Sequence, residues 1–208
     1  GGLILNNADG LNNLTVETKL AGQILANQNL THSALVILNE VMTNNASILN
    51  GFIEVAGTKA DVLVANYNGI TCATCGFINA GRATLTTGLP VITGGALTGL
   101  NVTQGSITIS GNGMNAGGTD LLDLLARKVV IDGPINAPAL EIHTGAAQWS
   151  YGSDTKTLQA GADSTPDYAI DASALGGMYA NQYNQDIANA TNAAQLYGGL
   201  AQGANDAG

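Results

Sequence analysis

The chain has 208 residues, of which 45% are hydrophobic and 10% are charged, and its formal net charge is −9. This length can bury a sizeable core in one domain, and the hydrophobic content argues against intrinsic disorder. Six scattered basic residues cannot form the cationic surface that nucleic acid binding requires, and an anionic membrane would repel the chain. The 28 glycines and 22 asparagines are poor helix formers and exclude a helical bundle.

The start of the sequence lies within a strand-like pattern, at Gly1-Gly2-Leu3. There is no initiator methionine and no basic segment followed by a hydrophobic one, so no signal peptide pattern is present. No apolar run approaches the roughly 20 residues that span a bilayer. We expect the chain to be a fragment or a processed form.

Short strand-like segments, separated by turns rich in asparagine and glycine, form the main pattern along the chain. Residues Ser106 to Ser110 alternate with a period of two, as a strand with one buried face does. Strands are expected at residues 3–5, 34–38, 51–55, 61–65, 100–102, 106–110, 127–131 and 139–143.

The fold class follows from what lies between these strands. No helical pattern of ten or more residues separates them, so a doubly wound α/β fold is not supported. An antiparallel sandwich and a parallel β-helix remain. Only 4% of residues are aromatic, and the abundant aliphatic residues with asparagine and glycine corners favour the β-helix. Its elongated interior is expected to be lined by Val62, Leu63, Val64, Ile107, Ile109, Val130 and Ile142.

Two stretches fit the strand pattern poorly. Residues Thr119 to Arg127 have a helix N-cap and good helix formers, so their propensity favours helix and strand about equally. The last residues, 183–208, are rich in alanine, asparagine and glutamine. They are expected to be flexible or to hold a short helix around Asp186 to Tyr197.

The candidates for chemistry are few. Cys72 and Cys75 are the only cysteines, and from spacing alone a structural disulfide, two free thiols, and a metal or redox site all remain open. His32 and His143 are far apart in the sequence. Asp120 and Asp123 are expected to face solvent, with ion binding as the lesser alternative. We therefore predict no enzymatic activity, no cofactor and no metal site.

Several ordered motifs resemble one family. Asn66-Tyr67-Asn68-Gly69-Ile70 is similar to the Asn-Pro-Asn-Gly-Ile signature of the two-partner-secretion domain, also called the haemagglutination activity domain. Gly76-Phe77-Ile78-Asn79 and the following Arg82, Thr84 and Leu85 fit the family's next motif. Upstream, Asn27-Gln28-Asn29-Leu30 resembles its Asn-Pro-Asn-Leu signature. Tyrosine and glutamine stand where the family has proline, so both turns lack the fixed φ of that residue.

The resemblance covers about residues 1–182 and implies a right-handed parallel β-helix with small extra-helical β elements. It implies a strand rather than a helix over Asp120 to Arg127, and a disulfide between Cys72 and Cys75. Filamentous haemagglutinin and contact-dependent growth inhibition toxins belong to this family. The implied function is that of an N-terminal secretion-signal domain of a large adhesin or toxin.

The resemblance also implies the partner and the location. The periplasmic domains of an outer-membrane transporter would recognise Asn27, Gln28, Asn29, Leu30, Asn66, Tyr67, Asn68, Gly69 and Ile70, and the parent protein would reach the cell surface or the medium of a Gram-negative bacterium. The parent could further bind receptors on host or neighbouring cells. Two other hypotheses are a β-helix that forms surface fibres or layers and a polysaccharide-cleaving enzyme, although no cluster of acids on one face supports the enzyme.

Overall fold

The computed structural model describes residues 1–153, 155–172, 178–187 and 192–196, and the regular elements within these ranges are all strands. Most of them belong to an 11-stranded sheet in which each pairing is parallel. The other strands form a four-stranded and a two-stranded antiparallel sheet. In this described part of the chain, no helix is long and apolar enough to cross a membrane.

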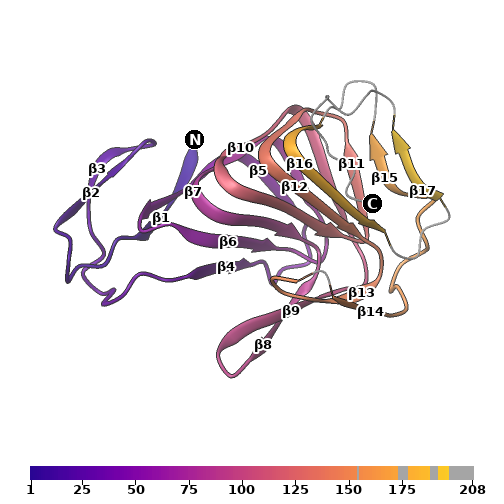
Figure 1. Cartoon of the computed structure of the whole chain (residues 1–208), viewed down its shortest axis with the longest axis horizontal. Helices are drawn as coiled ribbons and strands as arrows, with labels where there is room; N and C mark the ends of the chain where they lie inside the picture. The colour runs from indigo at the N-terminus through magenta and orange to yellow at the C-terminus, as the bar shows by residue number, and fades with distance from the viewer. Residues whose placement is uncertain (154, 173–177, 188–191, 197–208) are drawn as a thin grey trace.

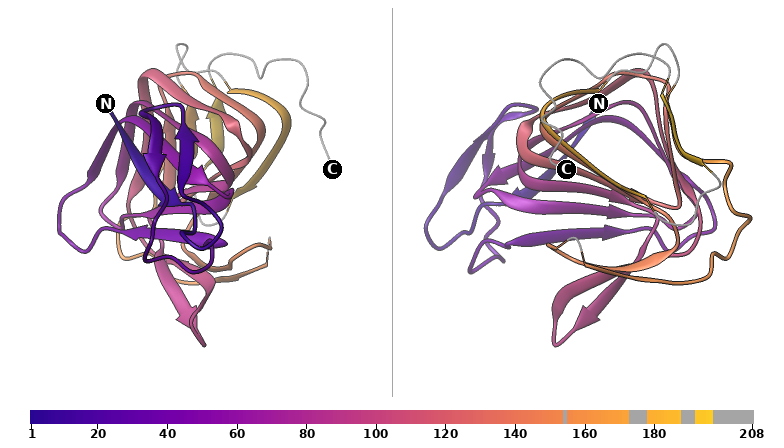
Figure 2. Two further views of the ribbon diagram at one scale, coloured as in Figure 1. Left: turned by 90° about the vertical axis from the view of Figure 1, so that its left-hand side faces the viewer. Right: turned by 45° about the vertical axis from the view of Figure 1, so that its right-hand side comes forward.

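The large sheet winds around a common axis, so that each turn of the chain lies beside the previous one (Figures 1 and 2). The first coils follow chain order from β1 (Gly2–Asn7) to β5 (Ser47–Gly57), β7 (Ile70–Thr86) and β10 (Ser106–Ala126). Beyond the corner at Asn79, β6 (Ala60–Ala65) pairs with the second part of β7, and β4 (Val36–Glu40) pairs with β6.

The later coils are split into two strands each. The two halves of β10 pair with β11 (Lys128–Ile131) and β12 (Ile135–Thr144). These pair in turn with β15 (Tyr168–Ala172) and β16 (Met178–Ile187), and β17 (Asn192–Leu196) pairs with β15. The stack of parallel coils confirms the predicted all-β parallel β-helix.

Aliphatic side chains fill the inside of the coils. Val62, Val64, Ile107, Ile109 and Ile142 belong to this core, as the sequence predicted. Two predictions within the set were wrong. Val130 is only partly buried because its neighbours Val129 and Ile131 take the inward positions of β11, and successive residues of a strand face opposite sides. Leu63 is fully buried for a different reason: it points out of the coil into a second core.

That second core lies beneath the four-stranded sheet. Two segments extend outside the β-helix. Residues 87–105 contribute β8 (Leu89–Thr93) and β9 (Ala96–Val102), and residues 145–167 contribute β13 (Ala147–Ser150) and β14 (Lys156–Leu158). Together they form a sheet of order β14-β13-β9-β8, below the coils in Figure 1. A separate hairpin of β2 (Thr15–Thr18) and β3 (Gly22–Leu25) lies at the N-terminal end. These are the extra-helical elements that the resemblance implied.

The two ambiguous stretches are resolved by stacking. Residues 119–126 belong to β10, where Leu122, Leu124 and Ala126 face the interior, so the parallel neighbours outweigh the helix propensity. At the other end, residues 183–187 continue β16 and residues 192–196 form β17, where a flexible segment or a short helix was expected. A domain boundary at residue 182 would therefore fall inside β16; residues 188–191 and 197–208 lie outside the described residues.

Candidate functional site

The two signature segments fold into the same turn. The side-chain oxygen of Asn27 accepts a hydrogen bond from the Asn29 N–H at 3.1 Å, and the Leu30 N–H donates to the Asn27 carbonyl at 3.0 Å. The side-chain oxygen of Asn66 likewise accepts from the Asn68 N–H at 2.9 Å, and the Gly69 N–H donates to the Asn66 carbonyl at 3.0 Å. Both are Asx turns, which asparagine forms without help from proline.

The second turn is anchored inside the protein. Asn66 is 1% exposed, and its Nδ2 donates to the Asn45 carbonyl at 2.9 Å and to Ser47 Oγ at 2.8 Å. Asn68 Nδ2 donates to the Thr43 carbonyl at 2.8 Å. Gly69 and Ile70 are buried as well, whereas Tyr67 and Asn68 are partly exposed. Most of this turn therefore holds the chain between two coils.

The first turn is more accessible. Gln28 and Asn29 are exposed, and Asn27 and Leu30 are partly buried. The Asn27 N–H donates to the Ala8 carbonyl at 2.8 Å, and the Gly10 N–H donates to the Leu30 carbonyl at 3.0 Å. The turn is thus attached to the chain that follows β1.

Asp9, which the sequence analysis did not single out, supports the first turn. It forms a parallel bridge with Asn27, and its Oδ1 accepts from the Asn12 N–H at 3.0 Å and from Asn12 Nδ2 at 2.7 Å. Burial acts to raise the pKa of Asp9, but the hydrogen bonds from Asn12 and from Ser33 outweigh it and hold the pKa below its ordinary value. The carboxylate is therefore favoured in the folded state.

The two turns do not share one recognition surface. The first precedes β4 and the second directly follows β6, and these strands pair from Val36 with Asp61 to Glu40 with Ala65. The length of this pair, about 13 Å at roughly 3.3 Å per residue, separates them. A partner that reads both turns would have to extend along the β4–β6 wall.

The motif after the second turn is explained by corners and packing. Phe77 and Leu85 are core residues, and Asn79 is the only described residue other than glycine with a positive φ, at 57°. Asn79 Nδ2 caps this corner by donating to the Val55 carbonyl at 2.8 Å and to the Gly57 carbonyl at 3.0 Å. The interior also holds the disulfide between Cys72 and Cys75, which are 0% and 4% exposed.

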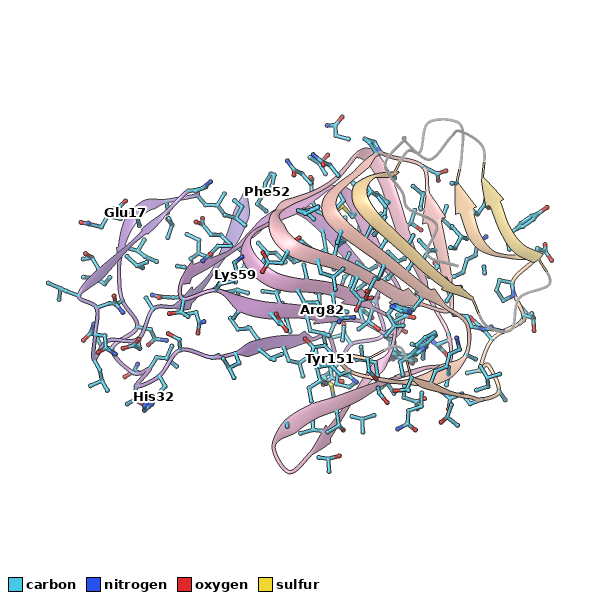
Figure 3. The ribbon with its side chains drawn as sticks, viewed as in Figure 1. Glu17, His32, Phe52, Lys59, Arg82 and Tyr151 are labelled. Carbon is cyan, nitrogen blue, oxygen red and sulfur yellow. A yellow bond between two sulfur atoms is a disulfide. The ribbon has the colours of Figure 1, made fainter. Side chains whose placement is uncertain are left out.

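Arg82 of the same motif enters a buried ionic cluster between the coils and the four-stranded sheet. Its guanidinium donates to Asp123 Oδ2 at 2.8 Å and to Glu141 Oε2 at 3.2 Å. Asp123 is 2% exposed, so the expectation that it faces solvent was wrong; only Asp120 does so, paired with Lys59. Figure 3 shows Arg82 and Tyr151 at this junction, and Tyr151 Oη donates to Asp61 at 3.1 Å.

The electrostatics of the cluster follow from its burial. Desolvation raises the pKa of Asp123 despite the opposing charges of Arg82 and His143. The pKa of Glu141 is lowered, first by a hydrogen bond with His143 and then by the charge of Arg82, although partial burial opposes this. No sequence motif indicates this cluster, because its members are 41 and 59 residues from Arg82.

The fold is a parallel β-helix in which the signature motifs build turns and corners. A family model described as the TPS secretion domain matches residues 1–207. The chain therefore belongs to the TPS secretion domain family, as the resemblance implied. Domains of this family are part of secreted or cell-surface exoproteins of Gram-negative bacteria, which are exported through the periplasm.

Individual relatives agree with this assignment. The chain is 46% identical over 183 residues to "Toxin CdiA" of Yersinia pestis and 39% identical over 214 residues to "tRNA nuclease CdiA-2" of Burkholderia pseudomallei (strain 1026b). These matches cover 87% and 98% of the chain but only 5% and 7% of those proteins.

A solved structure is similar as well. The filamentous hemagglutinin secretion domain matches with a TM-score of 0.80 at 32% sequence identity, covering 90% of this chain and 66% of that one.

Proposed function

We propose that this domain is the secretion signal of a large exoprotein and that the periplasmic domains of a partner outer-membrane transporter bind it at its two Asx turns. The observation that carries the proposal is the hydrogen-bond pattern shared by Asn27-Gln28-Asn29-Leu30 and Asn66-Tyr67-Asn68-Gly69 in a domain of this family. The same pattern at two separate positions in the chain fits a repeated recognition element.

The exposed atoms of the turns suggest how each is used. Gln28 and Asn29 present side-chain donors and acceptors to solvent, and Tyr67 and Asn68 do so in part. Asn66 and Ile70 are inaccessible once the coils have formed. We infer that the folded domain offers chiefly the first turn, whereas the second turn exposes only parts of Tyr67 and Asn68 and can be read in full only before the chain folds.

The parent protein would carry its activity outside this domain. The relatives are named as toxins or nucleases, and the chain spans 5–7% of their length. We infer that the parent is a contact-dependent growth inhibition toxin or an adhesin whose effector region follows this domain. Receptors on host or neighbouring cells would bind the parent rather than these coils.

The test measures binding of the folded chain to the immobilised periplasmic domains of the partner transporter, together with export from cells that carry both proteins. A Gln28→Ala, Asn29→Ala double variant should lose at least tenfold in affinity while its melting temperature stays unchanged, because both side chains are exposed. Asn112→Ala provides a matched control, since it removes another exposed asparagine at a different coil corner.

Two results separate the turns. If the double variant binds as the unchanged chain does, the folded first turn is not a recognition site. If Asn66→Ala reduces export although the folded variant binds normally, the second turn is read in the unfolded chain. Normal export of both variants would remove both turns from the recognition proposal.

A further inference from the structure

Three potential metal ligands converge where β10 and β12 lie side by side. Asp123 pairs with Glu141 in the parallel register, and Leu125 pairs with His143, so the three side chains project from neighbouring positions of two adjacent coils. One ligand atom from each lies within 4.8 Å of the others. His143 Nε2 is 3.5 Å from Glu141 Oε2 and 3.8 Å from Asp123 Oδ1.

The two carboxylate oxygens of Asp123 have different environments. Oδ2 accepts from Arg82 Nε at 3.1 Å, from Arg82 Nη2 at 2.8 Å and from Thr84 Oγ1 at 3.3 Å. Oδ1 is buried and accepts no hydrogen bond, on a side chain that is 3% exposed. A buried carboxylate oxygen without a donor is costly, and this one is directed towards His143. An ion at this point would satisfy it.

We propose that Asp123 Oδ1, Glu141 Oε2 and His143 Nε2 bind a divalent transition-metal ion of the zinc class. One imidazole nitrogen and two carboxylate oxygens suit zinc, whereas calcium and magnesium prefer oxygen ligands alone. Ligands around tetrahedral zinc lie about 3.3 Å apart, given bonds of roughly 2.0–2.1 Å. The shorter two distances here therefore need to contract by only a few tenths of an ångström.

The surroundings supply the remaining requirements. Arg82 offsets one of the two carboxylate charges. It holds Asp123 by the oxygen that the ion does not use, as an outer-shell partner does, and it also donates to Glu141 Oε2 at 3.2 Å. A small pocket of about 10 Å³, lined by Asp123, His143 and Trp149 among others, has room for roughly one water as a fourth ligand.

The ion would act as a structural clamp. Trp149 of β13 packs against the His143 side of the cluster, with its ring centroid 4.9 Å from that of His143, and Asp123 and His143 are buried. Binding would add a cross-link between the paired strands β10 and β12. It would thereby stabilise the surface of the coils against which the four-stranded sheet packs. Only the folded state assembles the three ligands, so the ion would favour folding once the chain has been exported.

Trp149 is the only tryptophan in the chain and serves as a reporter at the site. Titration of the metal-free chain with zinc chloride at pH 7.5 should change its emission with one-to-one stoichiometry. Cobalt chloride should give the visible absorption of a tetrahedral nitrogen–oxygen site. Zinc at about a hundred times Kd should raise the melting temperature by roughly 5–10 °C, and a chelator should reverse this.

Two substitutions and a control decide the assignment. His143→Gln and Glu141→Gln should each weaken zinc binding at least tenfold, and Glu141 is the safer of the two for folding because its side chain is 24% exposed. Asp120→Asn should bind zinc as the unchanged chain does, since Asp120 is an exposed residue of β10, the strand of Asp123, and pairs with Lys59. Circular dichroism shows whether each variant is folded.

The proposal fails if zinc up to 1 mM changes neither Trp149 emission nor melting temperature. It also fails if folded Glu141→Gln binds zinc as tightly as the unchanged chain. An emission change that follows pH between 5 and 8 but not zinc would assign the cluster to proton binding at His143 and overturn the metal site.

Discussion

Asn66 joins two segments of the chain through its side chain, whose Nδ2 donates to the carbonyl oxygen of Asn45, 21 residues earlier, at 2.9 Å. The same amide donates to Ser47 Oγ and accepts from the Asn68 N–H. Both polar atoms of the Asn66 side chain therefore have partners within the fold, whereas Asn68 remains partly exposed. Turn formation and recognition can be separated by substituting the two residues singly.

We expect Asn66→Ala to lower the stability by about 2–3 kcal/mol, because it leaves the Asn45 carbonyl and the Asn68 N–H without their partner. Asn68→Ala should cost less, about 1 kcal/mol, since it removes the bond to the Thr43 carbonyl at a partly exposed site. Urea unfolding followed by circular dichroism measures both. Equal losses would contradict the difference in burial.

The disulfide joins cysteines that are three positions apart in the sequence, so its entropic contribution to the stability is small. We expect a Cys72→Ser, Cys75→Ser variant to fold with a loss of about 1–2 kcal/mol from the missing loop closure. Two hydroxyl groups in the apolar interior add a further cost. A Cys72→Ala, Cys75→Ala variant should therefore be the more stable of the two. Two alkylatable thiols in protein that is denatured without a reductant would disprove the bridge.

Gly113 is where the pairing of β10 with β7 shifts its register, and its φ is 78°. A Cβ there would overlap the Pro134 carbonyl oxygen, which accepts the hydrogen bond from the Met114 N–H. We expect Gly113→Ala to destabilise the chain by about 3 kcal/mol or more, from backbone strain and displacement of the next coil. Gly94→Ala is the control: its φ is 60° but nothing lies within 4 Å of its Cβ position, so its loss should stay at about 1–2 kcal/mol.

Asp9 makes the N-terminal end sensitive to acid. Its pKa is lower in the folded chain than the ordinary value of 3.8, so its contribution to stability is complete above about pH 3.8 and is lost as the pH falls through the folded value. The hydrogen-exchange protection factors of residues 8–13 and 26–30 should therefore fall below that pH more than those of the central coils. In Asp9→Asn the protection of these segments should be lower already at pH 6, with a smaller further loss on acidification. An unchanged pH response in this variant would assign the sensitivity to another group.

Much of the fold can be predicted from local sequence because stacking repeats the same requirement in each coil. Alternation in Ser106 to Ser110 correctly placed Ile107 and Ile109 in the interior. The same reasoning failed at Val130. Three successive aliphatic residues of β11 do not show which of them point inward, and only the pairing with β10 decides this. Helix propensity over residues 119–126 misled for a related reason: the parallel neighbours on both sides decide the conformation of β10.

The candidate sites show a similar division. The Asx turns could be located from Asn-x-Asn spacing, because each forms within four residues. The cluster of Arg82, Asp123, Glu141 and His143 could not, because its members come from three strands, β7, β10 and β12, which meet only through the coil register. Burial of Asp123 depends in addition on the four-stranded sheet, whose two halves are separated by some forty residues.

The burial of Cys72 and Cys75 sets an order of events. With side chains 0% and 4% exposed, neither sulfur can meet an oxidant or a reductant after the coils have closed around it. Oxidation therefore has to take place while the chain is still open, and the finished molecule keeps whichever redox state it had at that moment. A bridge across so short a loop scarcely widens an extended chain, so it can be made before export without obstructing passage. The redox state of Cys72 and Cys75 in the folded protein therefore reports the redox conditions of the compartment in which the chain was last unfolded.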